Sequence, residues 1–379
     1  MTVTILCSGF GLGFYTPGLL VEASLNRMGI PTEVLVFENV MQSDQLQKVD
    51  KSRQAYHADF SVALMSQRIP QDIRKSMDDE QIVALLQQWE AEGRKHFICL
   101  SGHWIYILDR YREQIGEANL HVDLLYLDVI DSPSWKSVRK RLGQLHESYH
   151  EVWLFGHDQQ EMYTYIDIPL SDPVIPYSQR QHRLLVHGGG WGMGTYRERI
   201  AELEQVGYGL DIILYDQDER GSSDQGQRYY RMNPEWRTWQ QNEEGKHTFP
   251  PLGEVQVDQA VQYESRSEYH ILCEIERNVQ AIVSKPGGGT LADSFALSTP
   301  IIFLEPFGEH EARNASQWEK YGFGLSYERW MSEYGGGTDI LEQMHQQLVQ
   351  ARQQFPAYAD EYIQRHMQLL HPTMAKGTP

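Results

Sequence analysis

The chain has 379 residues, of which 41% are hydrophobic and 11% aromatic, and its formal net charge is −19 at pH 7. This length predicts two domains with sizeable cores, and the composition excludes a disordered chain. The negative charge argues against nucleic acid and anionic membrane surfaces as partners. No apolar run reaches the length of a membrane span, so we expect no integral membrane segment.

The cysteines indicate a reducing compartment. Cys7, Cys99 and Cys273 are far apart, lie in apolar stretches and form no Cys/His spacing typical of a metal site. The first residues read directly as a strand, so we expect no signal peptide. We therefore expect a cytoplasmic protein without a metal, and we interpret the basic run Lys136–Arg141 as a solvated helix face.

The N-terminal segment predicts a βαβ unit. A strand at Val3–Cys7 is followed by a glycine turn, Ser8–Gly13. Thr16-Pro17 suits a helix start with Thr16 as N-cap, and Gly29 suits the C-terminal end of that helix. Thr32–Phe37 is the next strand, which implies parallel pairing.

The rest of the first half continues as α/β. Ser43–Glu92 is mostly polar with helical periodicity, and further strands are expected at Phe97–Leu100, Val122–Leu127 and Val152–Phe155. Ile168–Gln181 contains three prolines and no periodic pattern, which is typical of a linker.

Beyond the linker the same order of elements restarts. We expect a strand at Arg183–His187, a turn at Gly188–Gly194, a helix near Arg197–Gln205 and a strand at Asp211–Tyr215. Two α/β halves that each open with a strand and a glycine turn predict two Rossmann-like domains facing across a cleft.

The remaining segments complete the predicted domain organisation. Gln217–Glu254 is interpreted as an elaborated loop that is functional or mobile, with a short strand near Val255. The last helices run from Asp339 to about Leu370, and the final one, after Pro356, is expected to cross back onto the first domain. The predicted bounds are 1–175 and 182–355, with the helix 356–379 joined to the first domain.

A glycine turn late in the chain carries the strongest functional signal. After the buried strand that begins near Ala281, Lys285 precedes Gly287, Gly288 and Gly289, and a helix follows. Glycine N–H groups and a helix N-terminus form a cradle for a phosphate. With Ala292 the spacing also fits the dinucleotide fingerprint G-x-G-x-x-A, but few strands remain to complete a nicotinamide domain.

Polar residues around this turn have two interpretations each. Thr290 and Asp293 form either a capping box or, through the Asp293 carboxylate, a contact to ribose hydroxyls. A second set of polar residues lies on the next predicted helix: Glu309, His310, Asn314 and Gln317. These residues are either an ordinary polar helix start or a sugar-binding cluster at the carboxyl end of a strand.

These residues resemble the nucleotide-sugar-binding segment of GT-B glycosyltransferases. The likeness is greatest to the branch with the peptidoglycan N-acetylglucosaminyltransferase and the glycolipid synthases. The family's K-P-G-G-x-T turn is matched by KPGGGTLAD at 285–293, followed by the strand Ile301–Pro306, Glu309 and the pair Asn314-Ala315. The first βαβ unit and the turn after His187 resemble the family's other glycine turns.

The resemblance implies a donor site in the second domain, with the sugar carried by a nucleoside diphosphate, uridine diphosphate by expectation. It implies inversion at the anomeric carbon, no metal and no further cofactor. The residues that would contact the donor are Gly188, Gly189, Gly190, Lys285, Gly287, Gly288, Gly289, Thr290, Asp293, Glu309, His310, Asn314 and Gln317.

One departure from the family concerns the acceptor side, where Gly11, Gly13 and Phe14 form the loop. Many members place a His or Asp three residues before the first helix's proline, and this chain has Phe14 there. Our substitute for the base is His103, which follows a strand and titrates near neutrality, with Asp131 second. His57 and His157 are weaker candidates.

With nine Trp and 21 Tyr, the chain favours a soluble aromatic or polyol acceptor, as in natural-product biosynthesis, and a monomer or homodimer. Asp216-Gln217-Asp218 has a metal-binding spacing but is interpreted as a solvated loop. Three alternatives stay open: a nucleotide-sugar epimerase or hydrolase of the same fold, an NAD-dependent oxidoreductase using Gly287, Gly289 and Ala292, and a binding protein without turnover.

Overall fold

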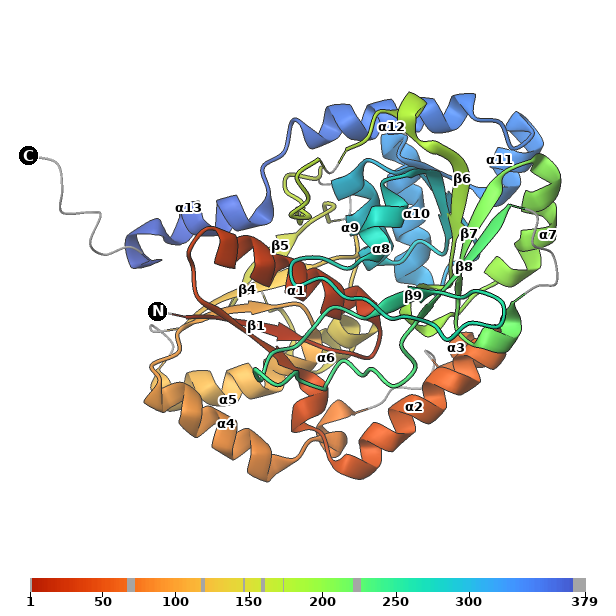
Figure 1. Ribbon diagram of the computed structural model, residues 1–379. Helices are drawn as coiled ribbons and strands as arrows, with labels where there is room; N and C mark the ends of the chain where they lie inside the picture. The colour runs from red at the N-terminus through yellow and green to blue at the C-terminus, as the bar shows by residue number, and fades with distance from the viewer. Residues whose placement is uncertain are drawn as a thin grey trace, which may run out of the picture.

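The computed structural model describes residues 2–66, 72–116, 120–145, 147–157, 161–172, 174–220 and 226–370. In them the chain forms two sheets, one after the other in sequence, each flanked by helices (Figure 1). The predicted α/β class with two parallel sheets is confirmed.

The first sheet has the strand order β2-β1-β3-β4-β5, and all its pairings are parallel. Its strands are β1 (Val3–Cys7), β2 (Thr32–Val36), β3 (His96–Cys99), β4 (His121–Tyr126) and β5 (His150–Trp153). Its helices are α1 (Leu12–Arg27), α2 (Ser43–Ala58), α3 (Phe60–Ser66), α4 (Asp79–Ala91), α5 (Ile105–Ile115) and α6 (Pro133–Leu142), with short 3-10 turns η1 (Phe37–Val40), η2 (Ile73–Ser76) and η3 (Gly102–Trp104). Every residue of β1 is buried, as expected for an inner strand covered by helices on both faces.

The second sheet has the order β12-β11-β10-β6-β7-β8-β9, parallel except for the β8–β9 pair. Its strands are β6 (Gln181–Val186), β7 (Gly209–Leu214), β8 (Gln227–Met232), β9 (Leu252–Glu254), β10 (Val279–Ser284), β11 (Ile301–Phe303) and β12 (Gly324–Ser326). Its helices are α7 (Tyr196–Val206), α8 (Leu272–Glu276), α9 (Gly288–Leu297), α10 (Glu309–Tyr321), α11 (Tyr327–Tyr334) and α12 (Asp339–Arg352), with 3-10 turns η5 (Tyr177–Gln179), η6 (Gly189–Trp191) and η7 (Gln217–Glu219). The last helix of the chain is α13 (Tyr358–Leu370). β10 is buried along its whole length between β6 and β11.

The strands predicted in both halves are all present, and two further ones were missed. β8 lies in the segment interpreted as a loop, because its sequence QRYYRM carries no run of apolar residues. β12 has only three residues, too few for a periodic signal. The part of the predicted loop at 221–225 lies outside the described residues.

The predicted N-cap at Thr16 is wrong, because α1 begins at Leu12 with Gly11 at its N-cap. Pro17 therefore lies inside the helix, where its missing N–H leaves the carbonyl of Gly13 without its usual partner. The burial of the α1 residues around Pro17 outweighs that loss. α1 also packs against α9, so its early start brings the two glycine turns together.

The two halves share a continuous apolar core. Ile5 and Leu19 of the first half belong to the same buried cluster as Phe295 and Trp318 of the second. The two sheets are therefore joined by a packed interface at one side of the site described below.

The last helix returns to the first sheet, and Figure 1 shows α13 (blue) beside α1 (red). The Tyr358 hydroxyl and the Arg365 guanidinium each donate a 2.7 Å hydrogen bond to Asp123 of β4, which is 2% exposed. Despite burial, His150 and Arg365 lower the pKa of Asp123 to about 2. The residue bounds of the domains remain a prediction, and residues 371–379 of the predicted last helix lie outside the described part.

All three cysteines are buried and free, as predicted. No helix in the described part of the chain is both long and apolar enough to cross a bilayer.

Candidate active site

The late glycine turn lies between the two sheets. It follows β10, and α9 begins at Gly288 with Gly287 as N-cap and no side-chain cap. A Cβ at Gly288 would lie 2.5 Å from the carbonyl oxygen of Leu127, just beyond β4, and one at Gly289 would lie 3.1 Å from Cα of Gly13. Only glycines allow the α9 N-terminus to come this close to the first half.

The capping-box interpretation of Thr290 and Asp293 is wrong. Gly287 occupies the N-cap, so Thr290 and Asp293 lie inside the helix rather than at a cap and its partner. Neither side chain is needed to satisfy the first N–H groups of α9. Both side chains are half-buried.

Lys285 places a cation between the two glycine turns of the second sheet. Its Nζ forms an ion pair of 2.5 Å with Oε1 of Glu311, and the side chains are 12% and 4% exposed. The ammonium lies within about 4 Å of a Cβ built on Gly189. Glu311 also accepts a 2.6 Å hydrogen bond from the N–H of Phe307. No role for Glu311 was predicted from the sequence. Its position in the first turn of α10, two residues after Glu309, could have indicated one.

His187 contributes a hydrogen-bond donor beside this cation. Its Nδ1 accepts a 3.0 Å hydrogen bond from the N–H of Gly189, so the neutral ring carries its proton on Nε2. Nε2 is buried and has no partner among the described residues. Burial, assisted by Lys285 and His270, lowers the pKa of His187 to about 3. Nε2–H is thus a neutral donor at physiological pH.

The turn after His187 depends on close backbone approaches. A Cβ at Gly188 would lie 2.5 Å from the carbonyl oxygen of Met193, and Gly189 has a φ of +69°. A Cβ at Gly190 would lie 2.4 Å from Cγ of Leu12 at the start of α1. The turn is therefore packed directly against the first half.

Asp293 has two buried neighbours that can share a ligand with it. Asp293, Glu276 and Cys273 each offer an atom, and these atoms lie within 4.8 Å of one another. Glu276 is 1% exposed, and neither of its carboxylate oxygens has a partner among the described residues. Burial raises the pKa of both carboxyl groups. Together they can accept hydrogen bonds from vicinal hydroxyls, and with the thiol they could also ligate a cation.

The four polar residues of α10 divide into two pairs. Asn314 is fully buried and hydrogen-bonded to Asp128, and Gln317 donates a 2.7 Å hydrogen bond to the Tyr321 hydroxyl. Glu309 is 63% exposed and pairs with Lys136 at 3.1 Å.

The fourth, His310, is half-buried beside the ring of Phe307, at a centroid distance of 6.3 Å. Of the four, His310 is the half-buried one for which the described residues offer no hydrogen-bond partner.

The three residues of the predicted acceptor loop, Gly11, Gly13 and Phe14, lie at the start of α1. Gly13 is exposed and Phe14 half-buried, with its ring packed against the shared core. The loop before them is held by Glu38, a fully buried carboxyl that accepts a 2.8 Å hydrogen bond from the N–H of Gly9. Burial raises the pKa of Glu38 to about 7. No sequence pattern marked Glu38 for this role.

The two candidate bases differ in their surroundings. His103 is half-buried between the rings of Phe10 and Phe37, each at 5.2 Å, and its Nδ1 has no partner among the described residues. Burial lowers its pKa to about 4. Asp131 forms a 2.8 Å ion pair with Arg139. His103 is thus neutral at pH 7 with an unpartnered ring nitrogen, whereas the Asp131 carboxylate is engaged by Arg139.

The weaker candidates also have partners. His57 lies at the boundary between the halves, with Nδ1 at 2.7 Å from the carbonyl oxygen of Gly192 and Nε2 against Glu219. His157 stacks on Trp153. Asp216 is 60% exposed and pairs with Arg231 at 3.5 Å.

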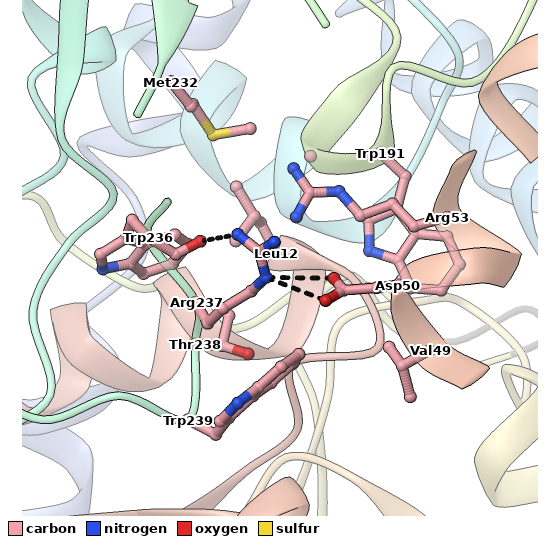
Figure 2. A pocket seen from close by; sticks show the side chains of 12 residues that line it. Leu12, Val49, Asp50, Arg53, Trp191, Met232, Trp236, Arg237, Thr238 and Trp239 are labelled. Carbon is pink, nitrogen blue, oxygen red and sulfur yellow. Dashed lines mark hydrogen bonds and ion pairs between the residues drawn. The ribbon is translucent and has the colours of Figure 1, made fainter. Parts of the chain in front are cut away.

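A segment of the second half crosses over the first half near the start of α1. Residues 233–251, which we call the strap, follow β8 and lead into β9, and Figure 1 shows this green-to-teal segment running in front of the first sheet. The Tyr15 hydroxyl donates a 2.8 Å hydrogen bond to the carbonyl of Thr248, and Arg237 pairs with Asp50 of α2 at 3.1 Å. Figure 2 shows a small pocket beneath the strap, lined from both halves.

A larger cavity of about 370 Å³ lies elsewhere, at the β9 edge of the second sheet and beside α8. None of the residues of the two glycine turns lines it. It therefore lies apart from both glycine turns.

Comparisons with known proteins identify the fold. No protein-family profile and no curated protein matches the chain. Among solved structures, the spinosyn rhamnosyltransferase SpnG is 12% identical, with a TM-score of 0.54 over 98% of this chain and 100% of that one. MurG of Acinetobacter baumannii is 11% identical, with a TM-score of 0.54 over 97% and 99%. The glycosyltransferase VinC, solved with dTDP, is 11% identical, with a TM-score of 0.55 over 98% and 100%. The whole chain thus has the fold of GT-B glycosyltransferases, as the sequence resemblance implied.

Proposed function

We propose that this GT-B protein is a glycosyltransferase that moves a sugar from a nucleoside-diphosphate sugar to a small acceptor. One observation carries the proposal: Lys285 lies between two glycine turns at the edge where the second sheet faces the first. A cation, glycine N–H groups and the N-terminus of α9 are the groups that a diphosphate requires.

The same groups serve the chemistry of transfer. When the anomeric carbon leaves the diphosphate, negative charge develops on the leaving oxygen. Lys285, the α9 N-terminus and the Nε2–H of His187 are fixed donors that stabilise this charge as it forms. In our proposal these residues neutralise the leaving group without a metal ion, and a single displacement inverts the anomeric carbon.

The nucleoside would be held by the carboxyl pair. Asp293 is half-buried, and Glu276 lies fully buried beside it. The carboxylate oxygens of both residues can accept hydrogen bonds from the ribose hydroxyls. VinC and SsfS6 were solved with thymidine diphosphate, which supports a pyrimidine nucleotide. We propose uridine diphosphate as the donor nucleotide, with thymidine diphosphate as the comparison in the test.

The base of the reaction is proposed to be His103. At pH 7 its imidazole is neutral and able to accept a proton, but a pKa of about 4 makes it a weak base. Such a base suits a hydroxyl with a pKa near 10, as in a phenol, better than an aliphatic alcohol. The proposal therefore favours an aromatic acceptor.

Ligand-dependent unfolding tests the donor site. We would record thermal unfolding with UDP, TDP, GDP and NAD, since a ligand at 100 times its Kd adds about 2.7 kcal/mol of stability. Stabilisation by UDP or TDP that is lost in Asp293→Asn supports the donor site. Stabilisation by NAD alone would overturn it in favour of an oxidoreductase.

Turnover separates the remaining alternatives. UDP-sugars incubated with the protein and a panel of phenols should give UDP and a glycoside. Conversion of the UDP-sugar without an acceptor would instead indicate an epimerase or a hydrolase. Binding without any turnover would indicate a binding protein.

A further inference from the structure

The strap is attached at one narrow neck. The N–H of Asn233 donates a 2.9 Å hydrogen bond to the carbonyl of Pro251, so the two ends of the strap meet. Between them the chain forms turns but no helix or strand. A loop tied at its ends and free of regular structure can move as one unit about its neck.

Polar contacts hold the strap against the first half. Besides the contacts of Tyr15 and Arg237 described above, the Asn39 amide donates a 3.0 Å hydrogen bond to the carbonyl of Trp239. Arg237 also donates through Nη1 to the carbonyls of Pro234 and Trp236, at 2.6 and 2.9 Å. Buried side chains hold the strap as well: Thr238 is 5% exposed, and Phe249, 2% exposed, belongs to the core that the two halves share.

Beneath the strap lies the pocket of Figure 2, which we call the chamber. It is lined by Gly9, Leu12, Val49, Asp50, Arg53, Gly190, Trp191, Met232, Trp236, Arg237, Thr238 and Trp239. Leu12 and Gly190 are in direct contact, so the chamber adjoins the start of α1 and the glycine turn of β6. It therefore opens next to the groups assigned above to the diphosphate.

The walls of the chamber are aromatic. Trp191 comes from the second sheet's glycine turn, and Trp236 and Trp239 come from the strap. Three indoles around one space provide flat apolar faces on which an aromatic ring can stack.

Arg53 supplies a cation to the same space. Its Nε is buried and has no hydrogen-bond partner among the described residues. Asp50, the carboxylate on the same wall, is engaged by Arg237, as the dashed lines in Figure 2 show. Burial lowers the pKa of Arg53, but a guanidinium stays charged at neutral pH. Arg53 itself is half-buried and packs over the Tyr215 ring at 5.3 Å. The chamber lining thus holds two guanidiniums, Arg53 and Arg237, against the one carboxylate of Asp50, and this excess of positive charge favours an anionic ligand.

We propose that the chamber binds the acceptor, and that this acceptor is a planar aromatic hydroxy acid whose ring stacks on the indoles and whose carboxylate pairs with Arg53. This inference rests on the proposed function. The acceptor hydroxyl forms the bond to the anomeric carbon, its proton passes to the base, and the diphosphate leaves with the electron pair of the broken bond.

In the present conformation the chamber has a volume of about 20 Å³, room for roughly one water molecule. An aromatic ring enters only when the strap swings outward about Asn233 and Pro251. The amide hydrogens of the strap should therefore exchange faster than those of the flanking strands, and an occupied chamber should change their rate.

Calorimetric titration with a matched pair of ligands tests the proposal. The probes are para-hydroxycinnamate and the neutral para-hydroxycinnamamide, each added to the full chain saturated with UDP. We expect the acid to bind at least about tenfold more tightly than the amide, as a charge-assisted pair with Arg53 requires. Equal affinity for the two probes, or binding of neither while UDP binds, would overturn the proposal.

Two variants of α2 assign the effect to one side chain. Arg53→Gln should remove the preference for the acid. Lys51→Gln removes the same charge from an exposed position on the same helix and should retain the preference. If Arg53→Gln still binds the acid more tightly than the amide, Arg53 is not the residue that pairs with the carboxylate. Trp239→Phe, which keeps a ring on the strap, should weaken both probes, with thermal unfolding as the check on folding.

The titration of UDP alone keeps the two proposals separate. Failure to bind any nucleoside diphosphate refutes the proposed function, whatever the cinnamates do. Binding of UDP with no discrimination between the probes refutes only the acceptor assignment.

Discussion

The side-chain amide of Asn314 donates a 2.7 Å hydrogen bond to Oδ1 of Asp128 and so ties α10 to the end of β4. The same amide donates to the carbonyl of Pro286 at 3.0 Å, and its oxygen accepts the N–H of Val129 at 3.0 Å. Asn314 is fully buried, and burial raises the pKa of Asp128. One side chain thus fixes the glycine turn of the second half against the first.

Asn314→Ala should destabilise the protein by about 3 kcal/mol, because it leaves buried polar groups of Asp128, Pro286 and Val129 without partners. Denaturant unfolding measures the change. The neighbouring Arg313 is exposed, so Arg313→Ala should change stability by less than about 0.5 kcal/mol. Equal losses of unfolding free energy in the two variants would show that the hydrogen bonds of Asn314 between the halves do not stabilise the protein.

Gly288→Ala should lower both the unfolding temperature and the affinity for UDP. Its Cβ would lie 2.5 Å from the Leu127 carbonyl oxygen, and a backbone atom cannot move aside as a flexible side chain can. The clash would push the α9 N-terminus away from the first half.

The control lies across the same interface. A Cβ at Gly13 would lie 3.9 Å from the nearest atom, the N of Gly289, which is an ordinary contact. Gly13→Ala should therefore be tolerated, or should stabilise α1 by up to about 1 kcal/mol. Calorimetry of both variants with UDP decides: a Gly288→Ala protein that matches Gly13→Ala contradicts the close approach.

The features predicted correctly from the sequence are those that depend on short-range residue patterns. The turn at Gly287–Gly289 and the turn after His187 each follow a buried strand, and a glycine cluster after a strand is a local pattern. The parallel sheets followed from the same strand–turn–helix order, without any knowledge of contacts. The GT-B resemblance rested on these segments and holds for the fold.

The sequence did not predict which residues far apart in the chain contact each other. Asn314 was expected near a sugar, but its amide is used by Asp128, which lies 186 residues earlier. Gly9 looked like one more turn glycine, yet it is closely packed because Thr238 of the strap would lie 1.8 Å from its Cβ. Neither relationship leaves a periodic or motif signal, since each depends on how the two halves meet.

Lys285→Met should weaken UDP binding by about tenfold to a hundredfold while leaving uridine binding little changed, because the lost cation serves the diphosphate. Competition titration with UDP and uridine measures both. Glu311 would be left buried without its ion-pair partner, so a fall in stability is also expected.

A second variant separates folding from binding at this position. Lys285→Arg keeps the charge beside Glu311 and should restore stability more fully than UDP affinity, since the larger guanidinium does not fit the same space. Equal losses of UDP and uridine affinity in Lys285→Met would show that the residue acts through folding alone.

The buried carboxyl of Glu38 predicts a pH dependence of stability. Its pKa rises from 4.5 to about 7 through burial, so between these values the folded state holds a proton that the unfolded state has lost. The free energy of unfolding therefore falls as pH rises through this window, by up to about 3 kcal/mol from this group, and the loss is complete above pH 7. Glu38→Gln, whose amide oxygen can still accept from Gly9, should remove the fall.

The measurement is urea unfolding of the wild type and Glu38→Gln at pH 5 to 8. The two proteins should differ little at the acid end, and the variant should gain relative stability with rising pH until the difference levels off. Glu113→Gln removes an exposed carboxylate from α5 and should run parallel to the wild type. A constant difference between Glu38→Gln and the wild type across this range would mean that Glu38 does not titrate in it, and that the loop at Gly9 is held by an ionised carboxylate throughout.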